Sequence, residues 1–243
     1  MPIAYFFRPS FDLPTRYMNF WLGLAKQDVA GLGFQVLDSS GEYATSYSFF
    51  DTMQTYNPDI VIADGHGDSN SLTGQGLQEV LRACTNNEVL SGKVMCAVSC
   101  LTGQGLGPDS RNKQATAYVG WVNEFTWVVS PEGDPANDPV AYCFQQIIRK
   151  MVTLACKYQQ QQISLRDLYD GVVAEFDYWI GYYSVPPGSN DPYASDILLS
   201  LRHDKTGMVT LGKEAIITPA LEVSLAPLVP IAAGSLLLFA LTL

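Results

Sequence analysis

The chain has 243 residues, of which 47% are hydrophobic and 16% are charged, so it can bury the core of one large α/β domain or two small ones. A formal net charge of -10 without a basic patch argues against binding to nucleic acid. The five cysteines do not have the spacing of a zinc site, and residues 1–10 do not resemble a signal peptide, so we expect no metal and a reducing compartment.

The first half of the chain alternates between two patterns. Short apolar runs predict strands at 3–7, 34–37, 59–63 and 94–98. Apolar residues at helical spacing predict helices at 15–29, 46–56 and 74–84, the last with Leu77, Val80 and Leu81 on one face. Strands that alternate with helices are typical of a mostly parallel sheet with helices on both faces.

The second half is more helical. A strand is predicted at 115–121, and residues 125–129 extend or follow it. Proline-rich loops are predicted at 130–139 and 185–192, long helices at 140–158 and 165–183, and a closing pair of strands at 197–201 and 208–211.

Residues 223–243 carry no charge, and the run is long enough for a membrane span, which needs about 20 apolar residues. Pro227 and Pro230 weaken its first third, so a core helix or a C-terminal strand is the alternative. We expect one folded domain at 1–213 and a membrane anchor at 214–243. Lys205 and Lys213 precede the run, which favours a membrane-associated protein with a cytoplasmic domain.

Two of the predicted strands end in residues suited to catalysis. The run at 59–63 leads to His66, one of only two histidines, which has a glycine on each side. The run at 94–98 leads to Cys100, and three glycines follow within seven residues. If the two strands are parallel neighbours, both residues emerge at the carboxyl edge of the sheet, where open α/β sheets bind their ligands.

A cysteine hydrolase needs a thiolate, a histidine that accepts and returns its proton, and donors for the oxyanion. Cys100 and His66 can form the pair, and the backbone N–H groups of Gly67 and Cys100 can be the donors. The simpler interpretation is that the glycines only shape turns and that a buried cysteine is a small hydrophobe. We apply that interpretation to Cys84, Cys96, Cys143 and Cys156, and we interpret His203 as a solvated turn residue.

At these residues the chain resembles the caspase-like cysteine peptidases, a group that includes caspases, metacaspases, legumain, separase, clostripain and the gingipains. The shared pattern is an apolar strand ending in His-Gly and a next core strand ending in the nucleophilic Cys. Here these are Gly65-His66-Gly67 and Ser99-Cys100-Leu101-Thr102-Gly103. The strand at 115–121 and the segment 198–212 look most like the gingipain-like and CHAT-like branches.

The resemblance implies a three-layer α/β sandwich and a peptide substrate hydrolysed through a thioester. It implies a catalytic dyad of His66 and Cys100, an oxyanion hole at the N–H groups of Gly67 and Cys100, and no cofactor. The separation of the dyad, 100 − 66 = 34 residues, is shorter than the roughly 50 of caspases, so a caspase proper is not expected.

The substrate pocket departs from the pattern of the group. Relatives carry a polar residue two positions before the cysteine, whereas this chain has Val98. We expect Val98 to form an apolar wall, with Trp121 as a second candidate wall. Asp68, Asp64 or the loop at 132–138 could supply charge for a basic substrate residue.

Two other functions stay open. A catalytically inactive caspase-like module could act as a membrane-anchored interaction protein, although the presence of both His66 and Cys100 argues against it. A doubly wound domain could bind an anion with the glycines at 65–76 and 103–107, but the acidic balance and the missing phosphate-loop lysine count against that.

Overall fold

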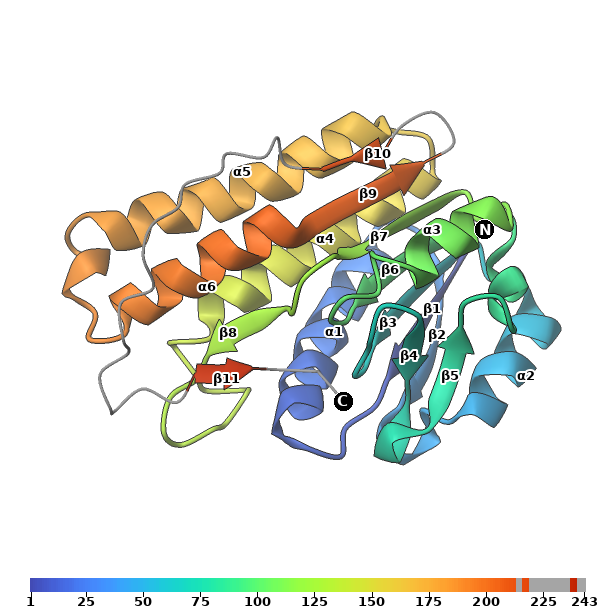
Figure 1. Cartoon of the computed structure of the whole chain (residues 1–243), viewed down its shortest axis with the longest axis horizontal. Coiled ribbons are helices and arrows are strands. Elements are labelled where there is room, and N and C mark those ends of the chain that lie inside the picture. The colour runs from blue at the N-terminus through green and yellow to red at the C-terminus, as the bar shows by residue number, and fades with distance from the viewer. Residues whose placement is uncertain (213–215, 219–236, 240–243) are drawn as a thin grey trace.

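The computed structural model describes residues 1–212, 216–218 and 237–239. These form an α/β protein around a seven-stranded sheet with the order β10-β9-β7-β6-β3-β1-β2 (Figure 1). Its strands are β1 (Ile3–Arg8), β2 (Gln35–Ser40), β3 (Ile60–Asp64), β6 (Val94–Val98), β7 (Ala117–Trp121), β9 (Met208–Gly212) and β10 (Ile216–Ile217).

The sheet is mostly parallel, as the sequence predicts. The five strands from β2 to β7 pair in parallel, whereas β9 runs antiparallel to β7 and β10 antiparallel to β9. Parallel pairing requires a crossover connection between strands, and the segments between consecutive parallel strands provide it. All parallel strands therefore end at one carboxyl edge.

Successive side chains of a strand point to opposite faces of the sheet, so both faces carry apolar residues. Helical layers cover both faces. In β1, Ala4 and Phe6 belong to one core, and Tyr5 and Phe7 to the other. The first core lies under α1 (Leu13–Gly31), α4 (Tyr142–Gln159), α5 (Leu165–Ser184) and α6 (Ala194–Gly207). The second lies under α2 (Ser46–Tyr56), α3 (Leu106–Asn112) and a hairpin. The predicted three-layer α/β sandwich is confirmed.

The hairpin replaces the helix predicted at 74–84, which is wrong. Strands β4 (Ser71–Thr73) and β5 (Glu79–Arg82) pair antiparallel and are joined by a short 3-10 turn, Gln75–Leu77. Gly76 adopts a φ of +64°, which glycine tolerates and which breaks an α-helix. Val80 and Leu81 are buried as expected, but against the second core through a strand, whereas Leu77 of the predicted apolar face is 46% exposed.

The strand predicted at 197–201 is also wrong, because these residues lie within α6. Strand β9 follows α6 directly, and it pairs with β7 and β10. His203 is therefore helical and half-buried, not a turn residue, and its Nε2 lies 2.9 Å from the carbonyl oxygen of Glu124. Helix α3, for which the sequence carries no clear periodic pattern, was missed.

The transmembrane helix predicted at 223–243 is wrong. Residues 223–236 and 240–243 lie outside the described part of the chain, but Leu237–Phe239 form a strand, β11, that pairs antiparallel with β8 (Thr126–Val128). Backbone paired in a strand cannot also belong to a continuous spanning helix. Within the described ranges, none of the helices is both long and apolar enough to cross a bilayer.

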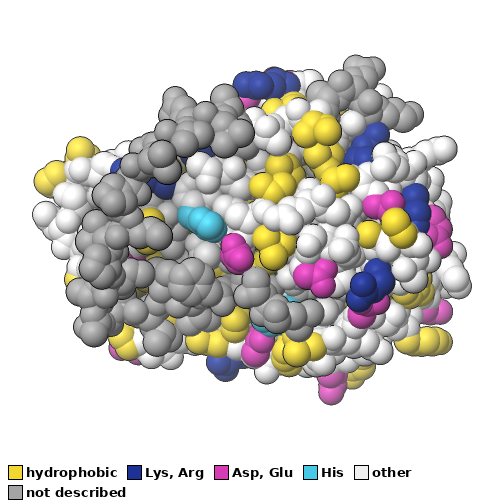
Figure 2. All heavy atoms as spheres, viewed as in Figure 1, with side chains coloured by type: hydrophobic (Ala, Val, Ile, Leu, Met, Phe, Trp, Pro, Cys, Tyr) yellow, Lys and Arg dark blue, Asp and Glu magenta, His cyan; other side chains and the backbone are white. Residues whose placement is uncertain are grey.

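Charged side chains are dispersed over the described surface. Figure 2 shows Lys and Arg scattered among acidic and apolar groups on the face in view. Several are paired with carboxylates, as in Lys205–Asp177 at 2.6 Å and Arg149–Asp28 at 2.8 Å.

Candidate active site

Strands β3 and β6 are parallel neighbours at the centre of the sheet. Asp64, the last residue of β3, lies opposite Val98, the last residue of β6. His66 and Cys100 each follow two residues later, so their backbones leave the sheet at the same edge. The sheet register thus brings together two residues that are 34 positions apart in the sequence.

His66 is held by a carboxylate that the sequence reasoning missed. Its Nε2 lies 2.6 Å from Oδ2 of Asp12, and its ring packs 5.7 Å from the ring of Phe11. Asp12 follows β1, whose carboxyl end lies at the same edge beside β3. That position after a parallel strand is the signal that could have identified it.

Asp12 has a second role, because its Oδ1 accepts the N–H of Thr15 at 3.0 Å and caps helix α1. Burial alone would raise the pKa of Asp12, but hydrogen bonds from His66 and Thr15 outweigh it and lower the pKa to about 2. Asp12 is therefore a carboxylate at physiological pH. A carboxylate beside Nε2 places the ring proton on that nitrogen and leaves Nδ1 as the basic nitrogen.

His66 is 7% exposed, and its Nδ1 has no hydrogen-bond partner among the described residues. The histidine backbone is fixed by the hairpin, since its carbonyl accepts the N–H of Thr73 at 2.8 Å and the Thr73 hydroxyl at 3.0 Å. An unpartnered basic nitrogen on a fixed ring is suited to accepting a proton.

Gly67 forms the contact between the two turns. A Cβ at this position would lie 2.2 Å from Oγ of Ser99 and 2.8 Å from the carbonyl oxygen of Cys100, so only glycine fits. Gly67 and Leu72 form a non-hydrogen-bonded pair, because the flanking ladder bonds are those of Asp68 and Thr73. The N–H of Gly67 is thus not used by this ladder, as an oxyanion donor requires.

Cys100 lies on the other side of this contact, and its side chain is 0% exposed. Its Sγ accepts the backbone N–H of Phe125 at 3.3 Å. Burial raises the pKa of the Cys100 thiol, and the nearby Asp204 and Glu124 add to the rise, although the Phe125 N–H opposes it. The thiol is therefore protonated in this conformation.

The turn that carries Cys100 is anchored to the next strand. Leu101 adopts a φ of +61°, which is rare for a residue with a side chain. Its N–H binds the carbonyl of Asn123 at 3.0 Å, and the N–H of Gly103 binds that of Trp121 at 2.7 Å. These bonds hold the strained turn against β7 and the segment that follows it.

The residues predicted to line a substrate pocket are not gathered into one. Val98 and Trp121 are both 0% exposed. Trp121 donates its indole N–H to the carbonyl of Asp204 at 3.0 Å and packs 4.5 Å from the ring of Phe125. Asp68 is half-buried and accepts the backbone N–H groups of Asn70 and Ser71 at 2.6 and 2.8 Å. In this conformation Val98 and Trp121 are core residues, and Asp68 orders its own turn.

Asp64 is the most unusual group beneath the site. It is 0% exposed, and neither of its oxygens has a hydrogen-bond partner among the described residues. Burial raises its pKa well above the ordinary value, although the charge of Arg8 partly opposes this. Asp64 is therefore a neutral buried acid and cannot supply the negative charge of a substrate pocket.

The described residues contain no cluster of three or more His, Cys, Asp or Glu side chains that could hold a metal ion. Comparisons of the chain with protein-family models, with curated proteins and with solved structures find no match. The arguments for a function therefore come from the geometry of Asp12, His66, Gly67 and Cys100.

Proposed function

We propose that the protein is a cysteine endopeptidase of the caspase-like type, in which Cys100 is the nucleophile and His66 the general base. The observation that carries the proposal is the meeting of three parallel strand ends. β1 is followed by Asp12, β3 by His66 and β6 by Cys100, all at one edge of the sheet. A base oriented by a carboxylate beside a cysteine turn is the arrangement that nucleophilic catalysis requires.

In the proposed reaction, Nδ1 of His66 takes the thiol proton of Cys100, and the thiolate attacks the carbonyl carbon of the scissile peptide. The N–H groups of Gly67 and Cys100 stabilise the oxyanion. The C–N bond breaks, the leaving amine takes the proton from His66, and a thioester remains. Water, deprotonated by His66, then hydrolyses the thioester and restores the thiol. Asp12 stabilises the imidazolium at each stage.

The buried thiol adds a step before catalysis. In the described conformation Cys100 faces Phe125 and is protonated, so the turn at 99–103 must release the Phe125 N–H before the thiol can meet a substrate. Lower burial also lowers the thiol pKa, which favours the thiolate. We therefore propose that this conformation is a resting form and that opening of the turn accompanies substrate binding.

A peptide carrying an electrophilic ketone tests the proposal. We expect a panel of such probes, varied at the residue before the electrophile, to label Cys100, as located by mass spectrometry. Labelling should disappear in Cys100→Ala and His66→Ala and persist in Cys84→Ala, which removes an exposed cysteine whose backbone N–H binds Asp109. Equal labelling of Cys100 in wild type and His66→Ala would overturn the assignment of the base.

One observation favours a second candidate, a catalytically inactive module of the same fold that binds other proteins. The thiol of Cys100 is fully buried and its pKa is raised, which is typical of a structural cysteine. If no probe in the panel labels Cys100 while the protein remains folded by circular dichroism, the inactive module becomes the better interpretation.

A further inference from the structure

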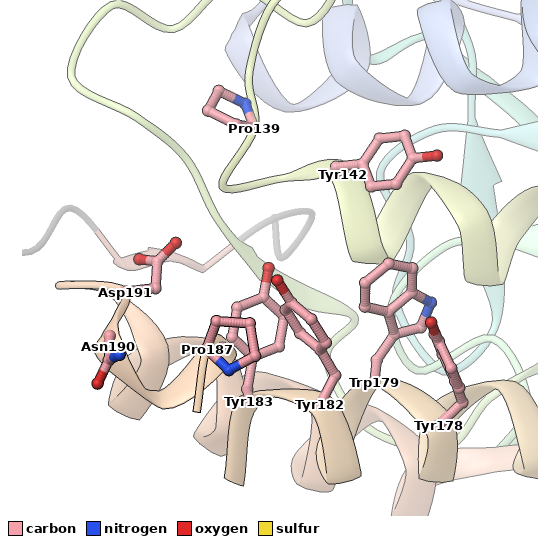
Figure 3. Close-up of a pocket in the computed structure, with 10 residues that line it drawn as sticks. Pro139, Tyr142, Tyr178, Trp179, Tyr182, Tyr183, Pro187, Asn190 and Asp191 are labelled. Atoms are coloured by element: carbon pink, nitrogen blue, oxygen red, sulfur yellow. The ribbon is translucent and has the colours of Figure 1, made fainter. Parts of the chain in front are cut away.

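A second concave site lies between α4, α5 and the loop that follows α5. It is a cavity of about 630 Å³, a volume typical of small-molecule sites. Its lining consists of Pro139, Tyr142, Tyr178, Trp179, Tyr182, Tyr183, Pro187, Gly188, Asn190 and Asp191. Figure 3 shows Tyr142 of α4 facing Trp179 of α5, and Asp191 at the opposite end of the row from Tyr178.

Most aromatic ring pairs in this cavity meet at steep angles, and Trp179 and Tyr183 are the exception at 32°. Trp179 makes angles of 87° with Tyr142, 81° with Tyr178 and 77° with Tyr182, at centroid distances of 5.1–5.9 Å. An edge-to-face contact places the edge of one ring against the face of the other, so the exposed ring surface of the cavity lies on the outer rings, where Tyr142, Tyr178 and Tyr182 are 49%, 61% and 40% exposed. The negative faces of the rings are therefore available to a positively charged group.

The ring at the centre is fixed, and the outer rings are exposed. The indole N–H of Trp179 donates to Oε1 of Glu175 at 3.0 Å, which sets the orientation of the ring. Tyr178 is 61% exposed, whereas Tyr183 is nearly buried and forms the inner wall. The fixed ring of Trp179 and the exposed ring of Tyr178 suit a ligand that enters the cavity from solvent.

The charge that lines the cavity is negative. Asp191 is the only ionisable acid or base among its described lining residues, apart from the tyrosine hydroxyls, and no Lys, Arg or His lines it. Burial raises the pKa of Tyr183, and the neighbouring Cys143 and Asp191 raise it further, so its hydroxyl stays neutral. The complementary ligand is a cation.

We propose that this cavity binds an organic cation with an alkylated ammonium group, seated against the exposed rings of Tyr142, Tyr178 and Tyr182, with Asp191 across the cavity adding negative potential. A primary ammonium would need acceptors for three N–H groups. The cavity offers one carboxylate and several ring faces, which fit a cation that donates few or no hydrogen bonds. The site does not depend on the proposed peptidase activity.

Tryptophan fluorescence of the full chain tests the proposal. Of the four tryptophans, Trp179 is the one that is not fully buried, so a ligand in this cavity changes its emission with little contribution from the others. We expect choline to produce a saturable change. Its uncharged isostere, 3,3-dimethylbutan-1-ol, should bind at least about five-fold more weakly, since it lacks the cation.

Matched variants separate the contributions that the aromatic ring, the tyrosine hydroxyl and the carboxylate charge make to choline binding. Tyr178→Phe keeps the ring and should bind choline as wild type does, whereas Tyr178→Leu should bind about three-fold to five-fold more weakly. Asp191→Asn should also weaken choline binding. It keeps an oxygen that can accept the N–H of Tyr193, as Asp191 does at 2.8 Å, so the loop stays ordered.

Equal binding of choline and its isostere, or unchanged binding in Tyr178→Leu and Asp191→Asn, would overturn the proposal. So would the absence of any saturable change with choline and with a peptide that contains trimethyl-lysine. Saturation by choline supports a small-molecule ligand, and saturation by the peptide alone supports a methylated protein as the source of the cation.

Discussion

The candidate active site has two halves that differ in how they are ordered. The histidine half consists of Asp12, His66 and Gly67, and its base is already paired with a carboxylate at 2.6 Å. The cysteine half is the turn at 99–103, whose thiol is buried and bound to Phe125. The same sheet edge thus presents one half whose histidine is paired with a carboxylate and one half whose thiol is buried.

The difference shows that strand order and side-chain access are separate requirements for catalysis. Parallel pairing of β3 and β6 brings both backbones to one edge. Access depends on the packing beyond the edge, where Phe125 and Trp121 cover the cysteine half. Four predictions test whether the two halves act together.

The largest expected effect is on turnover. Cys100→Ala and His66→Ala should each lower peptidase activity by at least about 10³-fold, because nucleophile and base act as a unit. The double variant should be no worse than either single one. Cys96→Ala, which alters the same strand in the core, should lower stability with little effect on activity. Full activity in Cys100→Ala would show that the halves do not form the site.

Asp12→Asn tests the carboxylate of the histidine half. Asn is as good a helix N-cap as Asp, so α1 should keep its stability, while the imidazolium loses its counter-charge. We expect kcat to fall by about 10²-fold with folding unchanged. Steady-state kinetics and a thermal melt measure the two effects. A loss of stability with normal kcat would mean that Asp12 serves only as a cap.

Gly67→Ala tests the contact between the halves. The added Cβ meets Ser99 and the carbonyl of Cys100, and a backbone oxygen cannot move away as a flexible side chain can. We expect the free energy of unfolding to fall by about 1–3 kcal/mol in urea denaturation. Gly181→Ala in α5 is the control, since a Cβ there meets nothing within 4 Å. Equal stability of the two variants would contradict the close approach.

Asp64→Asn should have the smallest effect, on the pH dependence of stability. Because the pKa of Asp64 is raised in the folded state, the folded chain keeps a proton that the unfolded chain loses above about pH 4. Wild type therefore loses stability as pH rises from there, and Asp64→Asn does not.

The Tm of the variant relative to that of wild type should therefore rise as the pH is increased from about 4 to about 7. Asp51→Asn, at an exposed position of α2, is the control and should leave the pH profile unchanged. A Tm difference between Asp64→Asn and wild type that does not grow with pH would contradict a raised pKa.

Local patterns in the sequence were sufficient for most of the sheet and for the long helices. The helix at 46–56 was predicted with the bounds that it has, and β3 and β6 within one residue. Burial on both faces makes such strands continuous apolar runs, which need no knowledge of the partner strand. The positions of His66 and Cys100 after these strands follow from the same signal.

Where the local sequence pattern was ambiguous, tertiary contacts decided whether a segment forms a helix or a strand. The residues at 74–84 have apolar spacing that fits a helix, yet they form a hairpin because Leu72, Val80 and Leu81 bury against the second core. Leu237–Phe239 lie in a run apolar enough for a membrane, yet they pair with β8. In both cases the choice depends on a partner distant in the sequence.

The side-chain contacts and the burial of the candidate site could not be predicted from the sequence. The pairing of Asp12 with His66 joins residues 54 positions apart, and the bond of Cys100 to Phe125 spans 25. Composition and spacing place these residues at an edge, but they do not determine which side chains touch. That depends on how β1 lies beside β3 and how the segment after β7 packs over β6, because desolvation and hydrogen bonding act through space and not along the chain.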